Sequence, residues 1–247
     1  MGSTYALFSF KKVLAVLPRG APLDVSFLNN HGLSAFHASH LAKSGWLTHL
    51  GRGVYMLPGD TLTRDGCLAY LMRRRAGLHV GGKTALAWRG VRHNVTFREV
   101  ITLWGEQQVR LPTWFLERFE CTYQTTQLFD PSLPKDFALQ PLPGGNPAVL
   151  VSAQERALLE HLSDVGKTES LQDTRDLIEN TRNLRLPVLE TLLAHTTRIK
   201  VVRLARALSE ELDLPWAATA KTYSEKKGGG ARWVAVSKGG ERLDLKA

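Results

Sequence analysis

The sequence has few cysteines, no long apolar run and no internal repeat, and each absence narrows what the chain can be. Its 247 residues include two cysteines, Cys67 and Cys121, which lie far apart and form no CxxC motif. We expect reduced, buried thiols in a cytoplasmic protein, with no disulfide framework beyond that one pair. No apolar run approaches the ~18 residues of a membrane span, so no membrane association is expected. The N-terminus lacks the features of a secretory signal.

The common signatures of catalysis are absent as well. There is no GxSxG and no HExxH, and GGKT at 81–84 has the Lys-Thr of a P-loop without its spaced first glycine. A metal-dependent nuclease needs carboxylates near a lysine. Glu99 and Glu106 bracket a predicted strand, but Gln107 and Gln108 follow instead of that arrangement. We therefore predict no enzyme activity, no cofactor and no metal.

Negative charge is scarce relative to positive charge. The chain has 32 Lys and Arg against 23 Asp and Glu, a formal charge of +9 and a pI near 9.8. This balance suggests a polyanionic partner, although many basic proteins are merely soluble. The segment 151–247 is the closest to neutral for its length. A polyanion surface is therefore expected within the first 150 residues.

The first 60 residues have the element order of a winged helix-turn-helix. A helix is predicted within residues 4–16, and Asp24 is a candidate N-cap for a helix over 25–30. Ser34 can cap a third helix that Gly45 ends. The stretch GWLTHLGRGVYMLPG at 45–59 then reads as a hairpin, with strand-forming runs on both sides of a glycine-containing loop. Three helices followed by a β-ribbon predict a winged helix-turn-helix.

The third helix would be the recognition helix. Ala35, Ala38, Leu41 and Ala42 fall on one face and should pack inside. The other face carries no carboxylate, which suits a helix lying along phosphates, although it could also be an ordinary solvated face. His37 and His40 could suit a metal by spacing, but no cysteine or carboxylate lies nearby. The residues predicted to contact DNA here are His37, Ser39, His40 and Lys43, and Phe36 could meet a thymine methyl.

Arg52 lies at the tip of the hairpin between Gly51 and Gly53, both of which can take positive φ. It could be solvated, or it could enter a minor groove or bind phosphate. Trp46, Leu50 and Tyr55 should pack the ribbon onto the helices. Further cations complete the predicted footprint: Arg19 as an additional DNA contact, and Arg73, Arg74 and Arg75 as an extended phosphate contact or a solvated helix end.

The fold class that follows is mixed α+β, with the winged helix, an α/β module and a mainly helical C-terminal region. The predicted domains are 1–60, 61–148 and 149–247. The α/β module ends in a proline-rich segment over 131–148, which is predicted to be a linker or a long irregular excursion. A capping box at Ser152–Glu155 is predicted to open a helix. Further helical segments are predicted near 170–180, 187–195 and 197–212, closed by Pro215, before a final hairpin that turns at 238–240. The last of these helices carries Arg198, Lys200, Arg203 and Arg206, which are expected to form its outer face or a surface for an acidic partner.

Three stretches resemble the AbiEi-type antitoxins, the transcriptional regulators of type IV toxin–antitoxin systems. The hairpin GWLTHLGRGVYMLPG is similar to the wing of that family, and GGKTALAWRG at 81–90 is similar to the segment after the winged helix. SAQERALLEHL at 152–162, RIKVVRLARALSEELDLPW at 198–216 and the closing GGERL resemble its C-terminal part. The resemblance spans almost the whole chain and carries no catalytic residue with it.

The resemblance implies a double-stranded DNA partner, namely repeats in the promoter of the chain's own operon, which the winged helix would bind and repress. It also implies a functional partner, a nucleotidyltransferase-like toxin of a phage-defence operon, and leaves open whether the two proteins touch. The sequence leaves the oligomeric state open.

Two other readings remain. One is a DNA-processing enzyme targeted by its winged helix, with chemistry in residues 61–130; a metal-dependent activity lost on changing Glu99 or Glu106 would favour it. The other is a non-catalytic adaptor whose C-terminal helices bind a protein.

Overall fold

The computed structural model describes residues 10, 12–92, 99–227, 233–236 and 242–245. The chain forms two compact units, and the mixed α+β class is confirmed. Unit 1 consists of Met1–Arg75 and Val109–Glu120, and unit 2 of Ala76–Gln108 and Cys121–Ala247. Unit 1 therefore takes in more than the first predicted domain, and the three-domain division stays a prediction.

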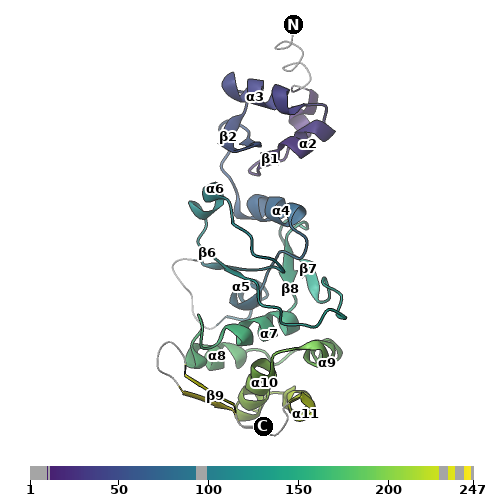
Figure 1. Ribbon diagram of the computed structural model, residues 1–247, viewed down its shortest axis with the longest axis vertical. Helices are drawn as coiled ribbons and strands as arrows, with labels where there is room; N and C mark the ends of the chain where they lie inside the picture. The colour runs from purple at the N-terminus through teal and green to yellow at the C-terminus, as the bar shows by residue number, and fades with distance from the viewer. Residues whose placement is uncertain (1–9, 11, 93–98, 228–232, 237–241, 246–247) are drawn as a thin grey trace. The chain divides into compact units, whose positions relative to one another are not determined.

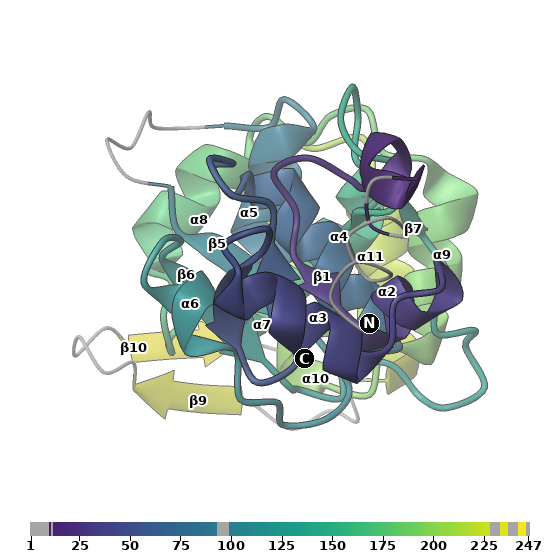
Figure 2. The ribbon, with the colours of Figure 1, turned by 90° about the horizontal axis from the view of Figure 1, so that it is seen from above.

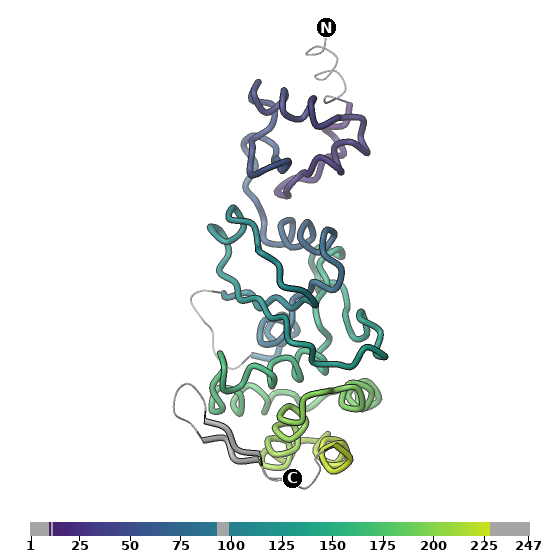
Figure 3. The backbone as a smooth tube through the Cα atoms, viewed as in Figure 1, coloured from purple at the N-terminus to yellow at the C-terminus, as the bar shows by residue number. Residues whose placement is uncertain are grey.

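Unit 1 contains a small sheet, a helical layer and one returning segment (Figures 1 and 3). The three strands run in the order β1-β3-β2, and both pairings are antiparallel. Its elements are η1 (Leu14–Val16), β1 (Leu23–Asp24), α2 (Val25–Asn30), α3 (Ala35–Lys43), β2 (Thr48–Gly51), β3 (Val54–Met56), α4 (Arg64–Arg74) and α6 (Thr113–Leu116). Helices α2 and α3 precede the β2–β3 ribbon, in the order predicted from the sequence, and the winged helix itself stays a prediction. The first predicted helix lies largely outside the described residues.

The helix starts of unit 1 follow from local side-chain chemistry. The Asp24 carboxylate accepts the Phe27 N–H at 2.7 Å, and the Ser34 hydroxyl accepts the His37 N–H at 3.3 Å. Both are N-cap bonds that satisfy an amide left free by the first turn. The predicted caps at Asp24 and Ser34 are therefore confirmed.

Unit 1 has a dense apolar core. Leu23, Leu28, Leu33 and Ala38 are fully buried and join strand β1 to helices α2 and α3. In the returning segment, Trp114 of α6 meets the Tyr70 ring of α4 edge to face, with centroids 5.8 Å apart.

Unit 2 is built on a five-stranded mixed sheet with the order β6-β5-β4-β8-β7. Strand β4 pairs with β8 in parallel, and β5 pairs with β6 in parallel. A separate antiparallel pair, β9 and β10, runs side by side (Figure 2). The elements are β4 (His79–Val80), α5 (Gly82–Trp88), β5 (Ile101–Trp104), β6 (Cys121–Gln124), β7 (Leu139–Pro141), β8 (Leu150–Ser152), α7 (Gln154–Asp164), α8 (Leu171–Ile178), α9 (Leu186–His195), α10 (Ile199–Glu211), α11 (Ala217–Lys227), β9 (Trp233–Val236) and β10 (Arg242–Leu245).

A buried carboxylate joins the sheet of unit 2 to its helices. Glu160 of α7 is fully buried and accepts hydrogen bonds from His79 Nε2 at 2.9 Å and Arg156 Nε at 2.9 Å. It also accepts from Ser152 Oγ at 2.8 Å and Gly82 N at 3.0 Å. Burial alone would raise the pKa of Glu160, but the charges and hydrogen bonds of His79 and Arg156 lower it to about 2. The network therefore keeps Glu160 ionised inside the protein.

Two expectations about local structure in unit 2 are wrong for the same reason. The Ser152–Glu155 capping box does not form: Ala153 is the N-cap of α7, Ser152 donates to Glu160, and Glu155 accepts from Arg185. Arg203 is not on an outer face of the helix, because only 3% of its surface is exposed. In both cases a tertiary environment overrides what the local pattern indicates.

Other parts of unit 2 differ from the sequence expectation in extent. Of the two alternatives for the proline-rich segment 131–148, the structure favours an excursion over a free linker, because the segment contributes β7, which pairs with β8. Helix α11 follows Pro215, where the sequence pattern predicts no helix. Cys67 is buried as expected, whereas Cys121 is only half-buried, and both are free thiols. The predicted turn at 238–240 lies outside the described residues. In the described ranges no helix combines the length and apolar character that a bilayer span requires.

Candidate nucleic-acid interface

Helix α3 presents a mixed polar and aromatic surface to solvent. Ala38 and Leu41 are buried as predicted, whereas Ala35 is exposed and Ala42 is half-buried. On the opposite face Phe36 is 71% exposed, the largest value among the exposed large apolar side chains of the described chain. This exposure leaves the Phe36 ring available for the predicted contact with a thymine methyl, although single exposed apolar side chains are common on protein surfaces.

The four predicted DNA contacts of α3 fall on or beside that face. Ser39 and Lys43 are exposed, and His37 and His40 are half-buried. The Phe36 and His37 rings meet edge to face at 6.0 Å. With no acidic side chain on the helix, this surface can approach phosphates without Coulombic repulsion of its own.

The ribbon holds Arg52 at an anchored tip. Gly53 takes φ +69° as predicted, whereas Gly51 does not adopt positive φ. The Gly53 carbonyl accepts the Val25 N–H of α2 at 3.1 Å, and a register shift lies between His49 and Gly51. Arg52 is exposed between these two fixed points. Anchoring lowers the conformational entropy that the tip would lose on binding.

The aromatic residues beside the ribbon divide between core and surface. Tyr55 is 6% exposed and packs in the core, as predicted. Trp46 is 40% exposed and meets the Phe10 ring edge to face at 6.2 Å, so it is only partly a packing residue. Leu50 is half-buried.

Arg19 is engaged within unit 1. Its Nη1 lies 3.0 Å from Asp60 Oδ1, and the other Asp60 oxygen accepts the Gly20 N–H at 3.0 Å. A DNA contact by Arg19 would therefore share this guanidinium with Asp60.

The arginine cluster at the end of α4 surrounds Asp24. Arg74 Nη1 lies 3.0 Å and Arg73 Nη2 lies 3.5 Å from Asp24 Oδ2, while Arg75 is exposed. Burial raises the pKa of Asp24, but the Phe27 N–H, Arg74 and Arg73 together lower it below its usual range. One carboxylate thus offsets part of the charge of the predicted phosphate contact.

The carboxylates considered for catalysis are engaged elsewhere in unit 2. Glu99 accepts from Trp88 Nε1 at 2.5 Å, and Glu106 pairs with Lys135 at 2.5 Å. Over the ranges that the structure describes, no group of three or more His, Cys, Asp or Glu side chains could hold a metal ion.

Two features of unit 1 do not follow from the sequence pattern. The pattern puts 109–120 in another module, yet this segment brings Trp114 beside Gly51, where a Cβ would lie 3.5 Å from the indole. The pattern also gives no sign that Asp24 is the partner of Arg73 and Arg74. Both contacts join residues more than 40 positions apart, and no local pattern signals them.

Comparisons with known proteins give a consistent result. Residues 98–245 match the family described as "Transcriptional regulator, AbiEi antitoxin, Type IV TA system", and residues 8–97 match the N-terminal domain of the same family. No curated protein matches the chain. A crystal structure of the RV2827C protein from Mycobacterium tuberculosis is similar in fold, with a TM-score of 0.56 and 17% identity. That similarity covers 94% of this chain and 89% of the other. Because the family matches extend over most of the sequence, the chain belongs to the AbiEi antitoxin family of transcriptional regulators of type IV toxin–antitoxin systems.

Proposed function

We propose that this protein represses its own operon by binding promoter repeats through α3 and the ribbon tip of unit 1, without catalysis. The observation that carries the proposal is the acid-free outer face of α3 together with Arg52 on an anchored ribbon. His37, Ser39, His40 and Lys43 would read or position the duplex from the groove, and Arg52 would contact the adjacent minor groove or phosphate. The family match supports this assignment.

Arg73, Arg74 and Arg75 would extend the phosphate footprint, and Arg19 would add a further contact. Such contacts position the protein and make binding depend on salt, but they carry little sequence information.

We further propose that the protein neutralises a nucleotidyltransferase-like toxin encoded beside it. The family match over residues 98–245 lies mostly in unit 2, so we assign the antitoxin activity to unit 2. Expression of this protein together with the neighbouring toxin should restore the growth that the toxin alone inhibits. The Arg52→Ala variant should restore growth equally well, because the ribbon serves DNA binding alone.

The deciding experiment measures binding to DNA from the chain's own upstream region across a salt series. We expect the native duplex to bind at least ~10³-fold tighter than a scrambled duplex of equal length. Arg52→Ala should lose affinity and reduce the salt slope by about one, because one phosphate contact is gone.

Arg182→Ala serves as the matched control, since Arg182 is an exposed arginine of unit 2 outside the proposed interface. Equal binding of both duplexes, or equal losses in Arg52→Ala and Arg182→Ala, would refute sequence-specific binding by the ribbon.

A further inference from the structure

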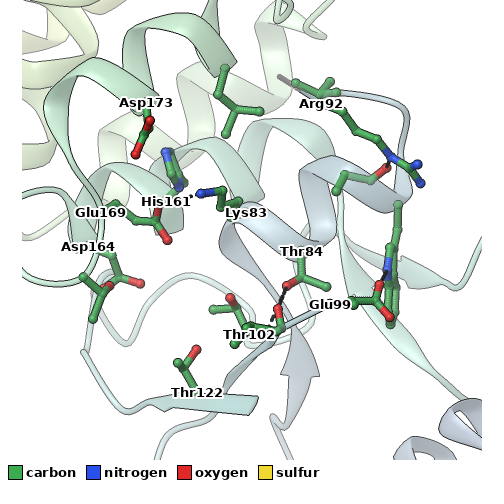
Figure 4. Close-up of a pocket in the computed structure, with 16 residues that line it drawn as sticks. Lys83, Thr84, Arg92, Glu99, Thr102, Thr122, His161, Asp164, Glu169 and Asp173 are labelled. Carbon is green, nitrogen blue, oxygen red and sulfur yellow. Dashed lines mark hydrogen bonds and ion pairs between the residues drawn. The ribbon is translucent and has the colours of Figure 1, made fainter. Parts of the chain in front are cut away.

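Unit 2 contains a cavity of about 580 Å³ that the proposed DNA binding does not use. Its walls come from α5, α7, α8 and strands β5 and β6 (Figure 4). This volume lies within the range of small-molecule sites. One side is apolar, with Ala87, Val91 and Leu177, and Trp88 also lines the space.

The first unusual group in the wall is His161. The Thr174 hydroxyl donates to Ser170 O at 2.7 Å, so its oxygen can only accept from His161 Nε2, which lies 3.1 Å away. The proton of the neutral ring is therefore on Nε2. Burial, reinforced by Lys83, lowers the pKa of His161 to about 3, so the ring is neutral. His161 Nδ1 is then a bare acceptor, buried and without a hydrogen-bond partner in the described chain.

The second unusual group is Asp164. It lies three residues after His161 on α7, so both side chains project from the same face of the helix. Asp164 is only 3% exposed, and its Oδ1 has no hydrogen-bond partner among the described residues. Buried acceptors without donors are rare and costly. Both residues line the same cavity, so a donor bound there would lie beside two acceptors that have no partner among the described residues.

The charges around the cavity define that donor. Glu99, Asp164, Glu169 and Asp173 line it, against the cations Lys83 and Arg92. Lys83 Nζ is held by Glu169 at 3.1 Å, and Arg92 Nε donates to the Ala87 carbonyl at 2.8 Å. Among the lining residues that the structure describes, carboxylates therefore outnumber cations, and both unpartnered atoms require N–H or O–H groups. An anion such as a phosphate fits this lining poorly.

We propose that this cavity binds a small organic cation, an alkyl guanidinium or alkyl ammonium, whose N–H groups donate to His161 Nδ1 and Asp164 Oδ1. The alkyl part of the ligand packs on the apolar wall beside Trp88. Charge-assisted hydrogen bonds in a buried site supply the affinity, and the apolar wall excludes water. The proposal is independent of DNA binding.

Calorimetric titration of the full chain tests the site with three probes of matched shape. Butylguanidinium and butylammonium carry the charge, and N-butylurea keeps the N–H donors without it. We expect saturable one-to-one binding of the cations, with N-butylurea at least about tenfold weaker because it lacks the charge for Asp164.

Variants locate the binding. Asp164→Asn should weaken butylguanidinium about tenfold or more, because the buried counter-charge is lost. Asp136→Asn removes the same charge from an exposed carboxylate outside the cavity and should change nothing. Lys83→Met should strengthen binding, because it removes a cation from the wall. Lys83 is exposed, so this variant remains informative if Asp164→Asn folds poorly.

Several results would overturn the proposal. These are no cation binding, N-butylurea binding as tightly as the cations, or equal effects of Asp164→Asn and Asp136→Asn. Unchanged binding in Lys83→Met would also count against a site within this cavity.

Discussion

At the scale of single residues, Asp164 shows how surroundings set a charge state. Burial raises the pKa of Asp164 to about 6, Lys167 and Lys200 oppose the shift, and Glu169 and Glu160 reinforce it. Between pH 3.8 and about 6 the folded protein keeps a proton that the unfolded chain releases. The contribution of Asp164 to the free energy of unfolding therefore falls as pH rises through that window. At neutral pH the ionised carboxylate destabilises the folded protein.

Asp164→Asn should therefore stabilise the protein at pH 7.5, by roughly 1–2 kcal/mol of unfolding free energy. The gain should vanish near pH 4, where Asp164 is already protonated in the folded state. Urea unfolding at both pH values measures the difference, and Asp136→Asn is the control. A lower free energy of unfolding for Asp164→Asn at pH 7.5 would contradict the conclusion that the ionised Asp164 carboxylate destabilises the fold.

This stability gain and the expected loss of cation binding belong together. Sites built for ligands keep groups that are poorly satisfied when empty, so removing them often stabilises a protein at the expense of its function. His161 follows the opposite rule for pH, because a depressed histidine pKa removes stability as pH falls below its ordinary value near 6.5. His161 is present in both proteins compared, so its contribution cancels.

At the scale of elements, Asp24 serves helix α2 and the end of α4 at once. It caps α2 through the Phe27 N–H and also pairs with Arg73 and Arg74. Asparagine caps a helix as well as aspartate does, but it carries no charge. Replacing Asp24 with asparagine therefore separates the two roles.

Asp24→Asn should raise affinity for the native duplex several-fold and steepen its salt slope, by up to about two, if Arg73 and Arg74 contact phosphates. The reason is that both guanidinium groups lose their internal counter-charge. Asp65→Asn, which removes a carboxylate from the first turn of α4, controls for net charge. The same gain in both variants would exclude a specific role for the arginine pair, and circular dichroism checks that α2 persists.

Element by element, the sequence predicts best where the determinants are local. Asp24 and Ser34 cap their helices through amides three residues away, so the pattern was sufficient. The sequence pattern predicts a cap at Ser152, but the Ser152 hydroxyl donates to Glu160. Glu160 in turn binds His79, which lies 81 positions away in the sequence. Helix α11 has no amphipathic periodicity and was missed.

The candidate sites also differ in how far the sequence predicts them. The exposed positions Ser39, Lys43 and Arg52 could be read from helix and hairpin geometry. The cavity could not, because His161 and Asp164 become unpartnered only when α5, α8 and the sheet close around α7. Arg203 likewise looked like an outward cation, yet it is buried in the tertiary structure.

At the scale of the whole molecule, unit 1 is discontinuous in sequence. Its second part, Val109–Glu120, supplies Trp114 and Phe115, which are 7% and 0% exposed. A fragment of residues 1–75 would lack both rings, and losing each such buried side chain costs about 3–5 kcal/mol. That sum is comparable with the total stability of a small domain.

We therefore expect residues 1–75 alone to fold poorly. Joining them to 109–120 through a flexible linker of about 12 residues should restore a cooperative thermal transition. The same joined chain with Trp114→Ala and Phe115→Ala is the control and should melt well below it. A sharp, equally stable transition for residues 1–75 alone would show that the returning segment is dispensable.

The discontinuity of unit 1 also determines the order in which parts of the chain can fold during synthesis on the ribosome. Synthesis runs from the N-terminus, so unit 1 cannot close until Glu120 has emerged, and by then β4 and β5 are already outside the exit tunnel. Strand β4 must wait longer, because its parallel partner β8 ends at Ser152. Val80 and Leu103, fully buried in the finished protein, are therefore uncovered during translation. The nascent chain passes through a stage in which a chaperone would protect it from aggregation, and slow translation over residues 121–152 would prolong that stage.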